Sequence, residues 1–292
     1  MSWRTVVVTG NAKLDYKMEY LVVRKVDATK CVHLSEIEVL MIESTTVSIT
    51  TALISELVNH KIKVIFCDSK HNPQSELMPY YGSHDSSGKV REQIKWDDEV
   101  RKLIWTDIIT EKIRQQMFLL QECHLFEQAE MLRRYIEEVE PGDETNREGH
   151  AAKVYFNALF GKDFTRSTDC VINAALNYGY GIVLSYFNRS ISYNGYITQL
   201  GLFHDNQFNP FNLTSDLMEP FRILVDRKVY HSGFTKFEKE EKLAMIELMN
   251  TRVKIDGKKN TVSNAIRIYT KSVFDAIRER DVAQLKYYRY EL

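Results

Sequence analysis

The spacing of apolar residues changes once along this chain, and that change restricts the possible folds more than any other feature. Up to Phe66, short Val- and Ile-rich runs alternate with polar turns, which is typical of strands. From Val90 onward, apolar residues recur three or four positions apart, which is typical of helices. The polar segment 69–88 separates the two patterns. We therefore predict an α+β protein with a small β-rich N-terminal domain (1–70), a linker (71–89) and an all-helical domain (90–292).

These patterns also predict individual elements. Strands are expected at Thr5–Thr9, Tyr20–Arg24, Cys31–Leu34, Ile37–Ile42 and Ile62–Phe66, with one helix near Thr50–His60. Helices are expected at Trp96–Met117, Leu119–Glu138, Arg147–Phe160, Thr168–Ser190, Glu219–Tyr230, Lys239–Met249 and Val262–Tyr288. A length of 292 residues suits two domains that each have their own core.

Several classes of protein lack support in the sequence. No apolar run approaches the ~18 residues that cross a bilayer, and the first residues lack a signal-peptide hydrophobic region, so we expect a cytoplasmic protein without a membrane partner. The four cysteines form no C-x-x-C pair, which argues against a zinc ribbon or redox motif. The Gly-rich motifs that bind nucleotide phosphates are absent, so no nucleotide cofactor is implied.

Charge is unevenly distributed, although the formal net charge is only -1. Residues 220–292 hold 16 Lys and Arg against 10 Asp and Glu, a net of +6, whereas residues 89–219 hold 14 against 20, a net of -6. This contrast has two interpretations. It describes either two solvated helical faces of opposite bias, or a surface that follows DNA phosphates beside an acidic metal site.

The segment from Asn146 to Gly161 is typical of one complete helix. Asn146 is a suitable N-cap and Gly161 a suitable C-terminal stop, which places Glu148 in the first turn. Small residues on the same face would let a large substrate approach this carboxylate. A carboxylate at this position is also common without any function, because it interacts favourably with the helix dipole.

A second group of polar residues lies near His204, in a loop rich in Asn and Phe. A lone loop histidine is more often a hydrogen-bonded residue than a ligand. Asp216 and Glu219 are three positions apart, so on one helix they would share a face and could ligate or support one metal. Pro220 leaves the helix start open, since it indicates either a break or a late first turn.

Two carboxylates and an imidazole suit a divalent metal acting on a phosphodiester. Oxygen-rich ligands favour Mg²⁺ or Mn²⁺ over structural zinc, and such an ion polarises a phosphoryl oxygen and stabilises a leaving oxygen. Spacing along the chain does not show whether Glu148, His204 and Glu219 meet in space.

Taken together, the motifs of this sequence resemble those of the integrase family that captures new spacers for CRISPR arrays, and specifically of its type II-A branch. The resemblance covers nearly the whole chain. The matching motifs are Trp3–Val8, His33–Ile37, Val64–Asp68, Met78–Gly82 with His84–Ser87, Asn146–Ala152, Ile172–Ala175, Asn177–Tyr180, Gln207–Asn209 and Asp216–Arg222.

The resemblance implies a site as well as a fold. Glu148, His204 and Glu219 are implied to be the catalytic residues and the ligands of Mg²⁺ or Mn²⁺, with Asp216 at a nearby supporting position. Many family members have Asp as the last ligand, and Glu219 follows the type II pattern. The β-rich domain is implied to mediate homodimerisation and the helical domain to carry catalysis and DNA binding.

The resemblance also implies partners. In the family's working complex, two such dimers flank a dimer of a small companion subunit, and double-stranded DNA runs across the assembly into the CRISPR repeat. Type II-A systems add a ring-shaped protein that binds DNA ends and an RNA-guided effector nuclease, which are candidate partners. Arg147, Lys153 and Arg222 are candidate DNA contacts on this chain.

The sequence and the resemblance together predict a metal-dependent DNA integrase and endonuclease. In the predicted reaction, a DNA 3′-hydroxyl attacks a repeat phosphodiester, so one bond forms as another breaks. Two alternatives remain open: a plain metal-dependent nuclease or phosphodiesterase, and a non-catalytic scaffold that binds DNA and partners.

Overall fold

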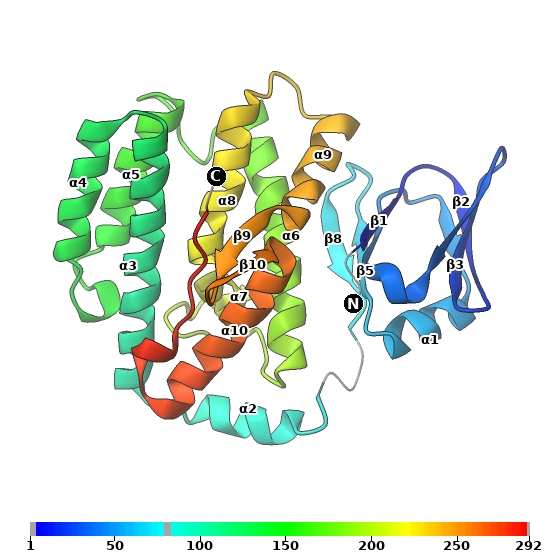
Figure 1. Ribbon diagram of the computed structural model, residues 1–292, viewed down its shortest axis with the longest axis horizontal. Helices are drawn as coiled ribbons and strands as arrows, with labels where there is room; N and C mark the ends of the chain where they lie inside the picture. The colour runs from blue at the N-terminus through cyan, green and yellow to red at the C-terminus, as the bar shows by residue number, and fades with distance from the viewer. Residues whose placement is uncertain (1–3, 79–82, 291–292) are drawn as a thin grey trace. The chain divides into compact units, whose positions relative to one another are not determined.

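The computed structural model describes residues 4–78 and 83–290 (Figure 1). Trp3 and Pro79 to Gly82, which belong to two of the matching motifs, lie outside the described residues. The chain divides into two compact units, one up to residue 81 and one from residue 82.

The first unit contains two four-stranded sheets. One sheet has the order β1-β5-β7-β8, in which β1, β5 and β7 are parallel and β8 is antiparallel; the other has the order β4-β3-β2-β6. The strands are β1 (Arg4–Val8), β2 (Ala12–Lys17), β3 (Tyr20–Arg24), β4 (Thr29–His33), β5 (Ile37–Ile42), β6 (Val47–Ile49), β7 (Lys63–Cys67) and β8 (Pro73–Glu76).

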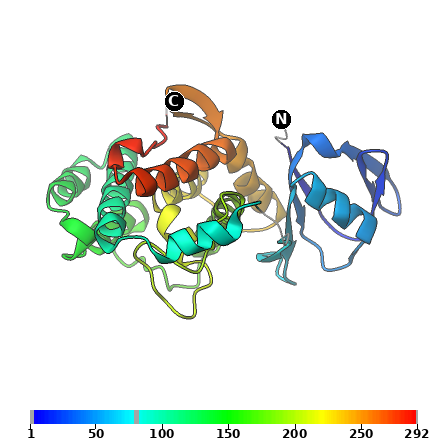
Figure 2. The same cartoon turned by 90° about the horizontal axis from the view of Figure 1, so that it is seen from below.

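One core joins these sheets to helix α1 (Thr51–Asn59), which lies beside the strands in Figure 2. Thr50 caps the helix by accepting a hydrogen bond from the Leu53 backbone N–H, and Leu53 and Leu57 are fully buried on its inner face. Leu14 of β2, Leu21 of β3 and Leu40 of β5 bury their side chains in the same cluster. The core forms because alternate strand residues point to the same face.

The segment predicted as a linker has regular structure. Its residues 73–76 form β8, which adds an edge strand to the first unit, and the second unit begins with α2 (Ser86–Ile94). β8 was missed because it is short and polar and contains Pro73, which is tolerated at a sheet edge. β2 and β6 were also missed, because their residues Lys13, Asp15 and Ser48 interrupt the apolar pattern.

The second unit is mainly helical and also contains a β-hairpin. Its main helices are α3 (Asp98–Glu122), α4 (Phe126–Glu137), α5 (Arg147–Phe160), α6 (Val171–Tyr193), α7 (Asn212–Leu217), α8 (Glu219–Ser232), α9 (Lys239–Ile246) and α10 (Val262–Glu279). Short 3₁₀ turns lie at Pro141–Asp143, Glu247–Asn250 and Val282–Gln284. No helix in the described part of the chain has the length and apolar character needed to cross a bilayer.

The hairpin corrects the prediction of an all-helical domain. β9 (Arg252–Ile255) pairs with β10 (Lys258–Thr261) in antiparallel register around a turn in which Asp256 and Gly257 both have positive φ. Val253 and Ile255 are buried on one side, while Lys258 and Lys259 are exposed. Charged residues outnumber apolar ones across 252–261, so hydrophobic periodicity did not reveal these strands.

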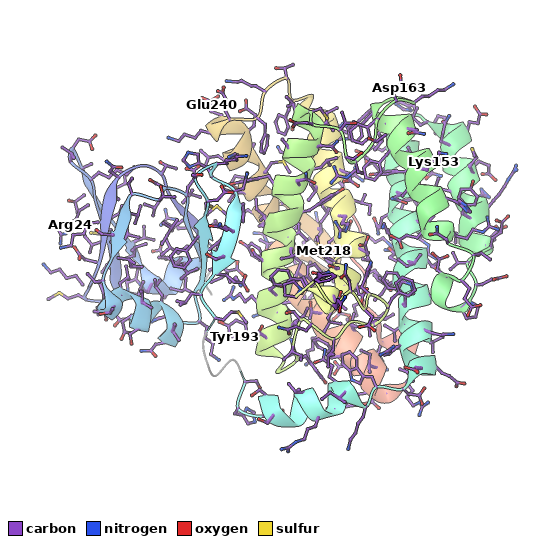
Figure 3. The ribbon with its side chains drawn as sticks, turned by 180° about the vertical axis from the view of Figure 1, so that it is seen from behind. Arg24, Lys153, Asp163, Tyr193, Met218 and Glu240 are labelled. Atoms are coloured by element: carbon purple, nitrogen blue, oxygen red, sulfur yellow. The ribbon has the colours of Figure 1, made fainter. Side chains whose placement is uncertain are left out.

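Helix α6 packs against α8, α9 and α10, beside which Figure 3 shows it. It is buried on most of its surface, and Gly179 permits close packing: a Cβ there would lie 2.5 Å from a methyl group of Val225. The long helix α3 packs against α4, α5 and α8. This packing places α5 and α8 on either side of α3 and thereby positions the candidate site.

Candidate functional site

Glu148 is positioned by the caps of α5. Asn146 has a left-handed backbone conformation and accepts a hydrogen bond from the Gly149 N–H, and Gly161 ends the helix, as the sequence predicted. The Asp143 carboxylate accepts hydrogen bonds from the backbone N–H groups of Arg147 and Glu148, at 2.7 and 3.1 Å. The first turn of α5 is therefore held at several backbone groups, and Glu148 projects from it.

Glu219 begins a new helix. Helix α7 ends at Leu217 and α8 starts at Glu219, with Pro220 in its first turn, where a missing backbone N–H costs little. Asp216 and Glu219 are thus on two consecutive helices, so of the two alternatives that Pro220 left open, the structure has the break. Proline favours a helix start over continuation of the preceding helix.

Lys112 of α3 joins the two predicted acids. Its ammonium lies 2.5 Å from Glu148 Oε1 and 2.5 Å from Glu219 Oε2. Burial acts to lower the pKa of Lys112, but the carboxylates of Glu219 and Glu148 outweigh that effect and raise the pKa. Burial acts to raise the pKa of Glu219, but the charges of Arg222 and Lys112 hold it below its usual value. Both carboxyl groups therefore face one cation.

His204 is held by Asp216. The imidazole Nδ1 lies 2.5 Å from Asp216 Oδ1, and the backbone N–H groups of Leu202, Phe203 and His204 also donate to this fully buried carboxylate. The hydrogen bond to Asp216 raises the pKa of His204, against the effect of burial. An Nδ1–H that donates to Asp216 leaves the Nε2 lone pair for another partner.

Gly201 allows the close approach between this loop and Asp216. A Cβ at this position would lie 2.4 Å from the His204 carbonyl oxygen and 2.6 Å from Asp216 Oδ2. Both distances are shorter than any normal contact. Glycine is therefore required for the backbone to wrap around the carboxylate.

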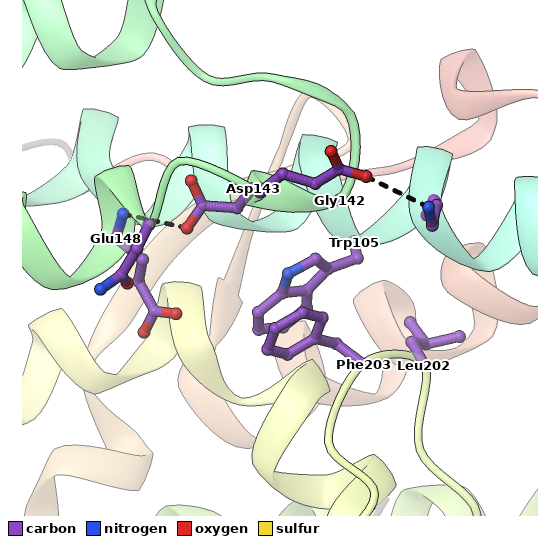
Figure 4. A pocket seen from close by; sticks show the side chains of 9 residues that line it. Trp105, Gly142, Asp143, Glu148, Leu202 and Phe203 are labelled. Carbon is purple, nitrogen blue, oxygen red and sulfur yellow. Dashed lines mark hydrogen bonds and ion pairs between the residues drawn. The ribbon is translucent and has the colours of Figure 1, made fainter.

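Two cavities meet at Glu148. The first, of about 370 Å³, lies between α3, the turn before α5 and the His204 loop; its lining includes Trp105, Asp143, Glu148, Leu202 and Phe203 (Figure 4). The indole of Trp105 and the ring of Phe203 stack in parallel with centroids 4.6 Å apart. The second cavity, of about 240 Å³, has a more highly charged lining: Lys112, Gln116, Glu148, Phe156, Arg166, Tyr180, Glu219, Arg222, Ile223 and Asp226.

The three predicted DNA contacts lie in different surroundings. Arg222 lines the second cavity and donates from Nε to Glu219 at 3.0 Å. Arg147 instead pairs with Glu138 at 3.2 Å, and Lys153 is exposed on α5 (Figure 3). Arg166, which the sequence did not single out, also lines the second cavity and hydrogen-bonds two neutral amides, those of Asn173 and Asn177.

The possible ligand atoms at this site are carboxylate oxygens and an imidazole nitrogen, which are of the kinds that bind a divalent cation. Glu148 and Glu219 reach the same ammonium from different helices, so their oxygens already converge on one cation. The orientation of His204 leaves one ring nitrogen available near these acids, which contribute to its raised pKa. Among the described residues, however, no three His, Cys, Asp or Glu side chains are gathered as a ready-made metal site. Lys112 stands between the two acids.

A buried carboxyl group is part of the lining of the second cavity. Asp226 of α8 accepts hydrogen bonds from the hydroxyls of Tyr155 on α5 and Tyr180 on α6, the former at 3.0 Å. Burial raises the pKa of Asp226 to about 6, although the two tyrosine hydrogen bonds act in the opposite direction. This group links the helices that carry Glu148 and Glu219.

Asp226 should make stability depend on pH. Its folded pKa exceeds the unfolded value of 3.8, so the folded state binds more protons between about pH 4 and 6 and stability falls as pH rises through that window. Relative to Asp226→Asn, the free energy of unfolding of the wild type should fall by about 1–2 kcal/mol between pH 5 and 7.5. Urea denaturation at several pH values measures this difference, and parallel curves for the two proteins would contradict it.

Sequence reasoning did not identify Lys112, Asp143, Arg166 or Asp226. On its own helix, Lys112 follows Glu111 and precedes Arg114, which is the pattern of an ordinary charged face. Of the four, Asp143 was the easiest to predict from the sequence, because an acid shortly before a helix start is a capping signal.

Comparisons with known proteins identify the family. Residues 5–263 match the family model described as CRISPR associated protein Cas1. The CRISPR-associated endonuclease Cas1 of Neisseria meningitidis is 32% identical over 291 residues, covering 98% of this chain and 96% of the relative.

Two solved structures share the fold. A casposase bound to an integration product has a TM-score of 0.77 and 17% identity, covering 96% of this chain and 92% of that one. A chain of a Cas6-RT-Cas1–Cas2 complex has a TM-score of 0.72 and 18% identity; the match covers 97% of this chain but 36% of the longer one. The family model spans most of both units, including every residue of the candidate site, and the chain belongs to the CRISPR-associated Cas1 family.

Proposed function

We propose that this chain is a divalent-metal-dependent DNA integrase and endonuclease that inserts short foreign duplexes into a CRISPR array. The observation that carries the proposal is the convergence of Glu148 and Glu219 on one cation, with His204 oriented beside them, in a member of the Cas1 family. The relative from Neisseria meningitidis is named an endonuclease, and the casposase structure holds an integration product.

The proposed roles follow from the contacts of each residue. Glu148, His204 and Glu219 would hold Mg²⁺ or Mn²⁺, which when bound supplies polarisation of a phosphoryl oxygen. Asp143 fixes the first turn of α5, and Asp216 fixes the tautomer and orientation of His204. Arg222 and Arg166 contribute positive charge to the cavity that a phosphodiester would enter.

The finer assignments belong to the same proposal. We infer the type II-A branch, self-association through the β-rich unit, and assembly with a small companion subunit, the DNA-end-binding ring protein and the effector nuclease. One supporting observation is that a fold relative comes from a complex whose name includes both Cas1 and Cas2. Light scattering on the purified chain, alone and with each partner, measures these associations.

The nucleophile provides the decisive test of the proposed reaction. Donor duplexes with free 3′-hydroxyls should be joined to repeat DNA in Mg²⁺ or Mn²⁺ without ATP, because the hydroxyl replaces the leaving oxygen of the repeat. Donors that end in 3′-dideoxynucleotides should not be joined. The assay uses the full chain, the companion subunit and a repeat-bearing plasmid, with covalent products resolved on a denaturing gel.

Each alternative function predicts a different result in this joining assay. Equal joining of blocked and free donors would contradict attack by the 3′-hydroxyl. Cleavage without any joining would favour a plain nuclease. Joining that survives replacement of Glu148 would favour a scaffold whose chemistry is supplied by another protein.

A further inference from the structure

The cation between Glu148 and Glu219 belongs to the protein itself. Lys112 is 7% exposed, and its ammonium lies 2.5 Å from one oxygen of each acid. Arg222 supplies a second positive charge, 3.0 Å from the other oxygen of Glu219. Two cations therefore balance two carboxylates, and the cluster is neutral without any added ion.

A neutral cluster of this kind resists a divalent cation. An ion that binds Glu148 and Glu219 must displace or approach the Lys112 ammonium, and the repulsion is strong because the groups are largely shielded from water. A phosphodiester changes this balance. The cavity that Lys112 lines also contains Arg166 and Arg222, so phosphate oxygens entering there would offset the added positive charge.

We propose that Lys112 is an internal counter-ion that competes with the divalent metal for Glu148 and Glu219 and keeps metal affinity low until DNA phosphates enter the second cavity. This inference rests on the proposed function. Its consequence is reciprocal: DNA raises the affinity for metal, and metal raises the affinity for DNA by the same factor. Lys112 is thus a positioning residue that acts through the two acids.

Metal affinity distinguishes this role from that of a structural ion pair. In Lys112→Met the side chain keeps most of its length and loses its charge. The full-length variant should bind Mn²⁺ at least about tenfold more tightly than the wild type in the absence of DNA, because the competing charge is gone. Lys112→Arg restores a positive charge and should return the affinity toward the wild-type value. Isothermal titration calorimetry with Mn²⁺ alone measures all three proteins at one pH.

The second part of the experiment measures the Mn²⁺ affinity in the presence of DNA. A duplex ending in 3′-dideoxynucleotides occupies the site without reacting. It should raise the Mn²⁺ affinity of the wild type by a factor within the roughly 5- to 150-fold range typical of coupled sites, and should raise that of Lys112→Met much less. Circular dichroism checks the fold, and Lys112→Gln replaces Lys112→Met if the latter does not fold.

The outcomes separate this inference from the proposed function. If Lys112→Met binds Mn²⁺ no more tightly than the wild type, while Glu148→Gln abolishes binding, the metal site stands and the role of Lys112 is overturned. Two double variants combine Lys112→Met with Glu148→Gln or with Glu219→Gln. If both bind Mn²⁺ as tightly as Lys112→Met alone, the acids do not hold the metal and both proposals fail. Tighter binding in Lys112→Met, lost on adding Glu148→Gln, supports both.

Discussion

Replacing Glu148 or Glu219 by glutamine, or His204 by alanine, should abolish the joining of donor DNA to the repeat while leaving the fold intact. Each change removes a proposed metal ligand, so the loss should exceed the roughly 10- to 100-fold typical of residues that only orient a ligand. Glutamine keeps the shape of the acid beside Lys112 and loses its charge. Strand transfer with the companion subunit present measures activity, and circular dichroism measures the fold.

Glu144→Gln is the matched control. Glu144 lines the first cavity with Glu148, but its side chain is 68% exposed and pairs with Lys102 at 3.3 Å. Because this pair is exposed to solvent, removing its charge should leave joining close to the wild-type rate. Near-wild-type joining by a Glu148, His204 or Glu219 variant would remove that residue from the proposed site.

Asp216→Ala should cause the largest loss of stability among the site variants. The substitution leaves three backbone N–H groups and the His204 ring without their shared buried acceptor. Breaking a buried charged network of this kind typically costs roughly 3–5 kcal/mol. Asp216→Asn keeps one acceptor oxygen and should be milder in stability, with joining reduced by about 10- to 100-fold because His204 is less well oriented. Urea denaturation and the joining assay measure the two effects.

Asp205→Ala controls for the loop. Asp205 follows His204 directly and is exposed, so its removal should change the free energy of unfolding little. If Asp216→Asn is as inactive as Glu219→Gln although it folds normally, Asp216 acts as a ligand. If Asp216→Ala is as stable as the wild type, the backbone hydrogen bonds to the Asp216 carboxylate do not hold the loop.

Local signals were sufficient to predict several elements. β3, β5 and α5 have the predicted bounds, because a run of β-branched residues between turns, or a cap at each end of a helix, specifies an element through contacts between near neighbours. The same holds for Glu148, whose place in the first turn of α5 follows from Asn146 alone. β8 and the β9–β10 hairpin were missed because their residues are polar, and pairing with a neighbouring strand stabilises them.

Only the tertiary structure determined which charged side chains are in contact. The sequence determined that Glu148 begins a helix and that Pro220 favours a helix start beside Glu219, but Lys112 lies 36 positions before Glu148 along the chain. Its contact with both acids exists because α3 packs between α5 and α8. Side-chain directions on a helix repeat every 3.6 residues whatever lies opposite them. The sequence of one helix therefore does not show which residues its charged face will contact. Long-range packing alone turned an ordinary lysine into the cation of the candidate site.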